Sequence, residues 1–398
     1  MKSKLADYLA ALLIVGIHFP AQAQTPVDPV RPISTITEGY LAKYNTIAHE
    51  LLNNEAASSK VTQDMYDFID SVVDEAQRRI AKKANYSRDE AVGALRVIDE
   101  ILIARNVVYP ADTAGMGLVA QFSDGLRGRT MNTAEIDALA AHRHNKRRST
   151  RIREHAAEPF YVNDCDTTSF LYLAIADVIQ LPLYLVELPG HNFVRFDDGA
   201  ISFDWETMDA VVAPPDYYKT LWRIPQALIL ERVYLATMNR ADVLGYHFSI
   251  TADIWAKKNA DQRSFNDDAK AAALYPRGPR VWNQIAWHLV AAHDPNLRDG
   301  PIALENAKKA ISISRTPNLL DTMACAYAQM KEFDLAVEVE KEGRDLYPTG
   351  NYPAEVPDFA EQLQLFAQHK TCAEISPAAL ASMSKKGPAN LSHIINLD

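Results

Sequence analysis

The chain has 398 residues, enough for two or three domains, and 48% of them are hydrophobic while 23% are charged. This balance is that of a globular protein and excludes an intrinsically disordered one. The formal net charge of −10 argues against a nucleic-acid-binding protein, because contact with phosphates needs a basic face.

The first residues have the pattern of a secretory signal peptide. Lys2 and Lys4 form a short basic start, and an apolar core follows over residues 9–19. Next comes Ala21-Gln22-Ala23, the small-x-small pattern after which signal peptidase cuts. The apolar core is too short for a spanning helix, which needs about 20 residues. We therefore expect a signal peptide over 1–23 with cleavage after Ala23, no stable membrane insertion afterwards, and a periplasmic or secreted protein.

Residues 24–157 are predicted to form an N-terminal helical region. Apolar residues recur at steps of three and four over 68–80, which predicts one apolar helix face. Ser87 followed by Glu90 is a capping-box signature, and Asn132 offers a further helix start.

A basic run closes this region over residues 142–153. Its functional interpretation is a docking patch for an acidic partner, or an exposed site for proteolytic processing. The alternative is a solvated loop or helix face, which such runs usually form. The run consists of His142, Arg143, His144, Lys146, Arg147, Arg148, Arg151 and Arg153.

Residues 158–224 predict a helix followed by strands. Apolar residues at helical spacing cover 167–178. Pro182 and Pro189 bound a strand rich in Leu, Val and Tyr. Two further strands flank Asp197-Asp198-Gly199, a hairpin turn with glycine where a positive φ is needed.

Residues 225–372 are helical and repetitive, and 373–398 form a C-terminal tail. Leu274-Tyr275-Pro276 recurs as Leu346-Tyr347-Pro348, a spacing of about two ~34-residue helix-turn-helix units with a small insertion. The unit over 317–348 resembles a tetratricopeptide repeat. Each helix pair of such a repeat buries its apolar face only by stacking on the next, and two or three units suit a protein-binding or structural module.

The three cysteines are Cys165, Cys325 and Cys372. In an oxidising compartment an odd count leaves at least one thiol free. A bridge between Cys325 and Cys372 is possible but does not follow from the sequence. Cys165 is the thiol with a chemical context, because it opens an apolar helical run.

Three short motifs in the order cysteine, histidine, carboxylate suggest a catalytic site. Cys165 follows Asp164 at the start of the predicted helix, His191-Asn192-Phe193-Val194 begins a strand, and Asp204-Trp205-Glu206-Thr207 lies in the next. A cysteine nucleophile needs a base within reach and a third group that orients the base. This order resembles the transglutaminase-like cysteine hydrolase superfamily.

The resemblance implies an α+β fold with a small papain/transglutaminase-like core, placed between the N-terminal helices and the tetratricopeptide-like repeats. It implies thiol-dependent acyl transfer with Cys165 as nucleophile, His191 as base and Asp204 as the group that orients the base. Hydrolysis of an amide or peptide bond is the expected reaction, since water is the default acceptor. A cross-linking transferase is the alternative reaction class that the sequence leaves open.

The surroundings of the thiol give further expectations. A helix N-terminus lowers the pKa of a thiol placed there, whereas the flanking Asp164 and Asp166 would oppose this if their charges lie close. We expect Asp164 or Asn163 to cap the helix instead.

Further residues are candidates for positioning the substrate. The Cys165 backbone N–H with Tyr161 or Asn163 is a candidate oxyanion site. Arg195 and the Trp205/Glu206 pair are candidates for lining a cleft, with a structural role as the alternative for either.

The sequence predicts no cofactor and no metal, since Asp164 and Asp166 have no histidine at ligand spacing. The expected partners are a protein or peptide substrate and a protein bound by the repeats. The competing hypothesis is a non-catalytic periplasmic binding or scaffold protein with a degenerate core.

Overall fold

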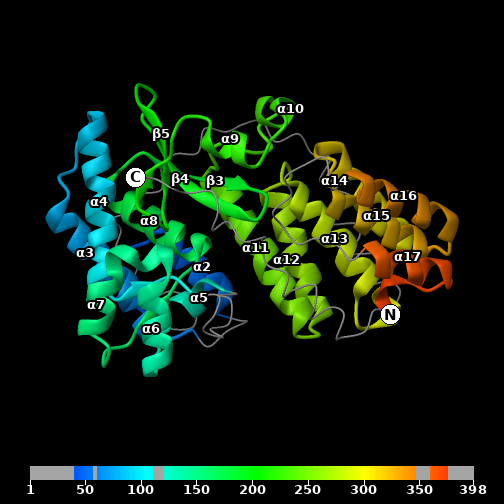
Figure 1. Cartoon of the computed structure of the whole chain (residues 1–398), viewed down its shortest axis with the longest axis horizontal. Helices are drawn as coiled ribbons and strands as arrows, with labels where there is room; N and C mark the ends of the chain where they lie inside the picture. The colour runs from blue at the N-terminus through cyan, green and yellow to red at the C-terminus, as the bar shows by residue number, and fades with distance from the viewer. Residues whose placement is uncertain (1–39, 57–60, 111–120, 347–358, 375–398) are drawn as a thin grey trace.

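The structure, a computed structural model, describes residues 40–56, 61–110, 121–346 and 359–374. It is a mixed α/β protein with many helices and one small antiparallel sheet (Figure 1). The predicted signal peptide lies outside the described residues, as does nearly all of the tail. No helix in the described ranges is both long and apolar enough for a membrane span.

Three helices form the N-terminal part: α2 (Ile47–Glu55), α3 (Gln63–Arg79) and α4 (Arg88–Ala104). The apolar face of α3 is buried, as its periodicity predicts. The Ser87 hydroxyl accepts from the Glu90 N–H at 3.3 Å, while the Glu90 carboxylate accepts from the Ser87 N–H at 2.8 Å. The predicted capping box is therefore confirmed.

Short elements connect these helices to the sheet. Asn132 caps α6 through the Glu135 N–H, as expected. Strands β1 and β2 pair in parallel. The elements are β1 (Val107–Val108), α5 (Phe122–Gly125), α6 (Thr133–Ala141), η3 (Arg143–Arg148), α7 (Ser149–Glu154) and β2 (Tyr161–Val162).

The sheet has the strand order β3-β4-β5-β6, and consecutive strands are antiparallel. Helix α8 (Cys165–Ile179) precedes it, so the predicted helix-then-strands order is confirmed. Gly199 has φ +84° in the turn between β4 and β5, the conformation that favours glycine there. The strands are β3 (Leu183–Leu188), β4 (His191–Asp197), β5 (Ser202–Glu206) and β6 (Val211–Val212).

The two faces of the sheet bury different apolar clusters. Val194, Phe196 and Trp205 share a core with α8, the N-terminal helices and the C-terminal helices. On the opposite face Phe193 packs on Tyr218, with ring centroids 4.0 Å apart, in a separate cluster. This alternation follows from the two-residue period of a strand. The second face is covered by α9 (Tyr217–Leu221) and α10 (Gln226–Leu230).

The C-terminal half stacks helices in chain order, so that each helix packs against the next and α13 also contacts α11 and α15 (Figure 1). The 3₁₀ turn η4 (Pro295–Leu297) lies between α13 and α14. The helices are α11 (Arg240–Lys257), α12 (Asp261–Leu274), α13 (Pro279–Ala291), α14 (Gly300–Ile313), α15 (Pro317–Gln329), α16 (Phe333–Leu346) and α17 (Phe359–Ala367).

A disulfide joins Cys325 of α15 to Cys372 of the 3₁₀ turn η6 (Cys372–Glu374) across 47 residues of sequence. Cys165 is the free cysteine. The bridge that the sequence left open is therefore formed, and the one thiol with a chemical context stays available.

Candidate active site

The start of α8 presents Cys165 as its first residue. Asp164 is the N-cap, and its carboxylate accepts from the Thr167 N–H at 2.9 Å and from the Thr167 hydroxyl at 3.0 Å. Burial and the charge of Asp166 raise the pKa of Asp164 to about 7. The expectation that Asp164 caps the helix is met, and its carboxyl is protonated in part of the molecules at neutral pH.

His191, the first residue of β4, is paired with a carboxylate. Its Nε2 lies 2.9 Å from Oε2 of Glu206, and the Tyr218 hydroxyl donates to the same oxygen at 2.8 Å. The imidazole stacks on Trp222 with centroids 5.6 Å apart, and the Trp222 indole N–H donates to the Pro189 carbonyl at 3.1 Å. The ring is thereby held by a carboxylate at its edge and an aromatic plane at its face.

The carboxylate that orients His191 is thus Glu206 and not Asp204. Asp204 lies directly opposite Arg195 in the β4–β5 pairing and accepts from its Nε at 2.6 Å and its Nη2 at 3.1 Å. Arg195 also donates to the Leu235 carbonyl at 2.8 Å. Because both acids lie on the same face of β5, two residues apart, the strand register decides which one reaches the histidine.

The charges of the pair are matched. Burial disfavours the imidazolium, but the charge and hydrogen bond of Glu206, together with Asp166 and Asp209, outweigh it and raise the pKa of His191. Burial likewise favours a neutral Glu206, yet the charge and hydrogen bond of His191 lower its pKa. Each partner of the pair therefore favours the charged form of the other.

The thiol itself does not show the lowered pKa that its helix position predicts. Cys165 is partly exposed, and burial together with the charges of Asp166 and Asp164 raises its pKa well above the ordinary value. The backbone N–H of Asn192, the neighbour of His191, offsets this in part. Within the described residues no hydrogen bond joins the Cys165 sulfur to the His191 ring. The resting thiol is therefore neutral.

Asp166 connects the site to the helical half of the protein. Its Oδ1 accepts a hydrogen bond from the Asn192 side-chain amide and another, at 2.7 Å, from the Tyr246 hydroxyl on α11. Burial raises the pKa of Asp166. The sequence predicted neither partner of Asp166. Asn192 lies 26 positions and Tyr246 80 positions further along the chain.

The other predicted positioning residues serve the fold. Tyr161 packs on Phe68 with centroids 4.4 Å apart, and the Asn163 amide donates to the Gly125 carbonyl at 2.9 Å. Trp205 is buried in the core. Arg195 is held by Asp204, so these four side chains are engaged within the protein itself, and their role in positioning a substrate stays a prediction.

The basic run is a free surface only in part: Arg143, Lys146, Arg147 and Arg153 are exposed, as the solvated interpretation expects, whereas other members are held in the fold. Arg148 is 1% exposed, donates to Asp99 at 2.5 Å and lies over the Tyr109 ring. His144 lies 2.5 Å from Asp209, three residues after Glu206. The run therefore ties the N-terminal helices to the end of β5, which neither the docking nor the solvated interpretation anticipated.

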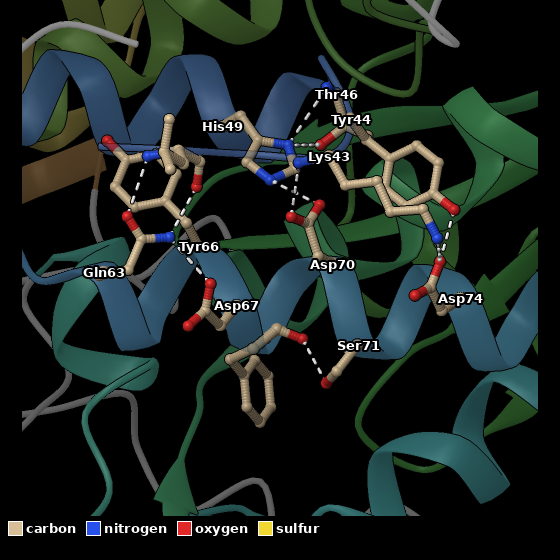
Figure 2. Close-up of polar contacts among 12 residues, drawn as sticks. Lys43, Tyr44, Thr46, His49, Gln63, Tyr66, Asp67, Asp70, Ser71 and Asp74 are labelled. Atoms are coloured by element: carbon tan, nitrogen blue, oxygen red, sulfur yellow. Dashed lines mark hydrogen bonds and ion pairs between the residues drawn. The ribbon is translucent and has the colours of Figure 1, made fainter. Parts of the chain in front are cut away.

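A second row of hydroxyl, imidazole and carboxylate lies between α2 and α3. Figure 2 shows His49 between Thr46 and Asp70, with Nδ1 at 2.9 Å from the Thr46 hydroxyl and Nε2 at 3.4 Å from Asp70. Thr46 and His49 are both 0% exposed and form the capping box of α2. A hydroxyl without solvent access cannot attack a substrate, so this row is structural.

Two cavities in the described part of the chain have linings that do not include Cys165. One of about 570 Å³ is lined by residues that include Lys83, Gln180 and Asp197, and another of about 370 Å³ by residues that include Arg232, Asn239 and Arg277. Among the described residues, no three His, Cys, Asp or Glu side chains are grouped so that they could hold a metal ion.

A comparison with protein-family models, with curated proteins and with solved structures finds no match for this chain.

Proposed function

We propose that this protein is a thiol-dependent acyl-transfer enzyme that hydrolyses an amide or peptide bond with Cys165, His191 and Glu206. The observation that carries the proposal is the 2.9 Å pair of His191 and Glu206 at the start of β4, beside the helix start that bears the free thiol. The proposed core is transglutaminase-like.

The hydrogen bond to Glu206 assigns roles to the two ring nitrogens. Since Nε2 donates to the carboxylate, Nδ1 is the nitrogen that, in the neutral imidazole, takes the proton of the Cys165 thiol. The thiolate then attacks the carbonyl carbon, forming a C–S bond, and the imidazolium protonates the leaving amine as the C–N bond breaks. Water, deprotonated by His191, cleaves the resulting thioester, releases the acid and restores the thiol.

The remaining parts of the proposal concern location and partners. We infer an exported protein, supported by the signal-like start and by the Cys325–Cys372 disulfide, a bond that persists in oxidising compartments. The stacked helices α11–α17 are proposed to be tetratricopeptide-like repeats that hold a protein partner.

The raised thiol pKa favours a second candidate, a binding or scaffold protein with an inactive core. A neutral Cys165 without a hydrogen bond to His191 has no nucleophilic advantage over an ordinary cysteine. The two candidates differ in whether His191 changes the reactivity of the thiol.

The deciding experiment follows hydrolysis of a mixed peptide library by mass spectrometry. Cys165→Ala and His191→Ala should abolish cleavage, and Glu206→Gln should slow it by about 100-fold or more. Asp204→Asn is the matched control and should retain most of the activity, because Asp204 is bonded to Arg195.

Cleavage by Cys165→Ala at the wild-type rate would refute the mechanism. If the wild type cleaves nothing, and iodoacetamide labels Cys165 equally fast in wild type and His191→Ala, the scaffold candidate is favoured.

A further inference from the structure

The candidate nucleophile and the candidate base each have a polar neighbour in the sequence, and these two neighbours are hydrogen-bonded to each other. Asp166 follows Cys165 on α8, and Asn192 follows His191 on β4. The Asn192 side-chain amide donates to Oδ1 of Asp166. This contact therefore ties the start of the helix that bears the thiol to the start of the strand that bears the imidazole.

The direction of the His191 side chain makes the spacing of these two starts important. Successive side chains of a strand point to opposite faces of the sheet. His191 therefore shares a face with Phe193, which packs on Tyr218 of α9. Asn192 lies on the other face, which packs toward α8. The thiol and the imidazole must meet around the end of β4, so their separation depends on how closely the start of α8 is held to that end.

Tyr246, on α11, is a second donor to the same oxygen. Its hydroxyl donates to Oδ1 of Asp166 at 2.7 Å. Tyr246 is 6% exposed and Asn192 is 0% exposed, so both donors are largely shielded from water, where hydrogen bonds are stronger. Because a tyrosine side chain is rigid, its hydroxyl holds the carboxyl group in one place. We call Tyr246, Asp166 and Asn192 the Asp166 network.

Helix α11 is itself held against the rest of the protein. Arg240, its first residue, pairs with Glu50 of α2 at 2.9 Å and with Asp177 of α8 at 3.1 Å. The residue after α12, Tyr275, donates to the Glu187 carboxyl group of β3 at 2.6 Å. Since α11 and α12 pack side by side, these contacts fix α11 relative to both α8 and the sheet. The donor that α11 contributes to the network therefore comes from an anchored element.

We propose that Tyr246 and Asn192 are positioning residues for acyl transfer at Cys165. Through Asp166 they set the distance between the thiol and the His191 imidazole, so the helical half supplies a part of the candidate active site. This inference rests on the proposed function and deepens it, because the helices that are proposed to hold a partner then also align the catalytic pair.

The test measures how much His191 contributes to the reactivity of the thiol. Cys165 is labelled with iodoacetamide, which forms an S–C bond with the thiolate as the C–I bond breaks and iodide leaves. The His191 effect is the labelling rate constant divided by that of the same protein carrying His191→Ala, read by mass spectrometry at a series of pH values. Tyr246→Phe removes only the hydroxyl and should lower the largest value of the His191 effect about fivefold, since one hydrogen bond contributes a factor of that order.

The pH dependence separates positioning from a change in charge. If Tyr246→Phe altered only the charge of Asp166, the labelling profile would move along the pH axis equally with and without His191. The largest value of the His191 effect would then stay the same, and this outcome overturns the proposal. A loss of alignment lowers that value.

Tyr44→Phe is the matched control. Tyr44 is 4% exposed, and its hydroxyl donates to the Asp74 carboxylate of α3 at 2.5 Å (Figure 2). The substitution removes the same group from a tyrosine–carboxylate contact among the N-terminal helices and should leave the His191 effect unchanged. If Tyr44→Phe and Tyr246→Phe lower the effect equally, the loss reflects a general loosening of the protein and the proposal is overturned.

An exchange of partners tests the hydrogen bond itself. Asn192→Asp places two carboxyl groups face to face and should abolish the His191 effect. Adding Asp166→Asn restores an amide–carboxylate hydrogen bond with donor and acceptor exchanged, and it should recover most of the effect. A double variant that matches the wild type in thermal unfolding and still lacks the effect contradicts the proposal. Tyr246→Phe decides the question alone if Asn192→Asp does not fold.

The positioning role and the proposed function can fail separately. A His191 effect that is present in the wild type and unchanged in Tyr246→Phe overturns the positioning role and keeps the catalytic pair. A wild type without any His191 effect refutes both.

Discussion

At the scale of single residues, the protonation of His191 depends on Glu206. The charge and hydrogen bond of Glu206 are the largest of the effects that raise the pKa of His191, and burial opposes them. Glu206→Gln removes the charge and leaves the burial, so the His191 pKa should fall by about one pH unit or more. The ring C–H resonance of His191, followed by NMR across pH, measures this change directly.

Asp204→Asn serves as the comparison for that titration. Asp204 faces Arg195, so the pKa of His191 should change little in this variant. If the pKa of His191 falls by the same amount in both variants, the two acids act on it only through their general negative charge. The 2.9 Å contact between Nε2 of His191 and Oε2 of Glu206 then has no special role.

The register of the β4–β5 hairpin decides which acid reaches the histidine. The turn was predicted at 197–199, and counting back from it would place Asp204 opposite Asn192. In the structure Asp197 pairs with Ser202, so the connection is longer and Asp204 lies opposite Arg195. The sequence therefore did not give the register, and the motif Asp204-Trp205-Glu206-Thr207 offers two acids on one face that only their cross-strand neighbours tell apart.

At the scale of elements, the approach of α11 to the end of α12 requires a glycine. A Cβ on Gly245 would lie 2.6 Å from the Cβ of Tyr275 and 2.8 Å from its backbone nitrogen. Gly245→Ala should therefore separate the helices, weaken the Tyr275–Glu187 hydrogen bond and destabilise the protein by about 1–3 kcal/mol. Thermal unfolding and the rate of Cys165 labelling report the two effects.

Gly93→Ala, inside α4, is the matched control for this helix contact. A Cβ there meets nothing within 4 Å, so the variant should be as stable as the wild type or more stable by about 0.5–1 kcal/mol. If Gly245→Ala behaves like Gly93→Ala, the close packing at Tyr275 does not limit stability.

The elements that the sequence predicted are those with local signals. The caps at Ser87 and Asn132 and the hairpin turn at Gly199 each need only neighbours a few residues away. The basic run shows the opposite case. Arg148 reaches Asp99 across 49 positions, a partner that no spacing rule connects to it, so Arg148 is buried within a run whose other arginines are at least partly exposed.

At the scale of the whole molecule, polar contacts join the N-terminal helices to the C-terminal half. Arg240 of α11 pairs with Glu50 of α2 at 2.9 Å and with Asp177 of α8 at 3.1 Å. Pairs separated by up to 190 positions depend on how the regions pack, which single-sequence patterns do not encode. The candidate site lies between these regions, and Tyr246 could therefore be recognised as a partner of Asp166 only in the fold.

Glu55 is the most deeply buried of these connections. Its carboxylate accepts from the backbone N–H groups of Phe122 and Ser123, each at 2.8 Å, and lies 3.4 Å from His247 of α11. Burial raises the pKa of Glu55 from 4.5 to about 7. Burial also lowers the pKa of His247 to about 3, so the imidazole is neutral at working pH.

These pKa values predict opposite effects on stability. Between pH 4.5 and about 7 the unfolded chain has released the Glu55 proton while the folded chain keeps it, so stability falls by about 3 kcal/mol as the pH rises. Between pH 3 and 6.5 the unfolded chain binds a proton on His247 that the folded chain excludes, so stability rises with pH. In the wild type the two effects oppose each other between pH 4.5 and 6.5, where the two pH ranges overlap.

Glu55→Gln removes one effect and leaves the other. The variant replaces one of the two acceptor oxygens with an NH₂ group and should be less stable at low pH, but its free energy of unfolding should then rise relative to the wild type by about 3 kcal/mol between pH 4.5 and about 7. Denaturant unfolding at a series of pH values measures the difference, in which the titration of all other groups cancels. Glu305→Gln on the exposed face of α14 should follow the wild-type curve. Parallel curves for Glu55→Gln and the wild type would show that Glu55 ionises normally in the folded protein, and the junction of the two halves would then be hydrated.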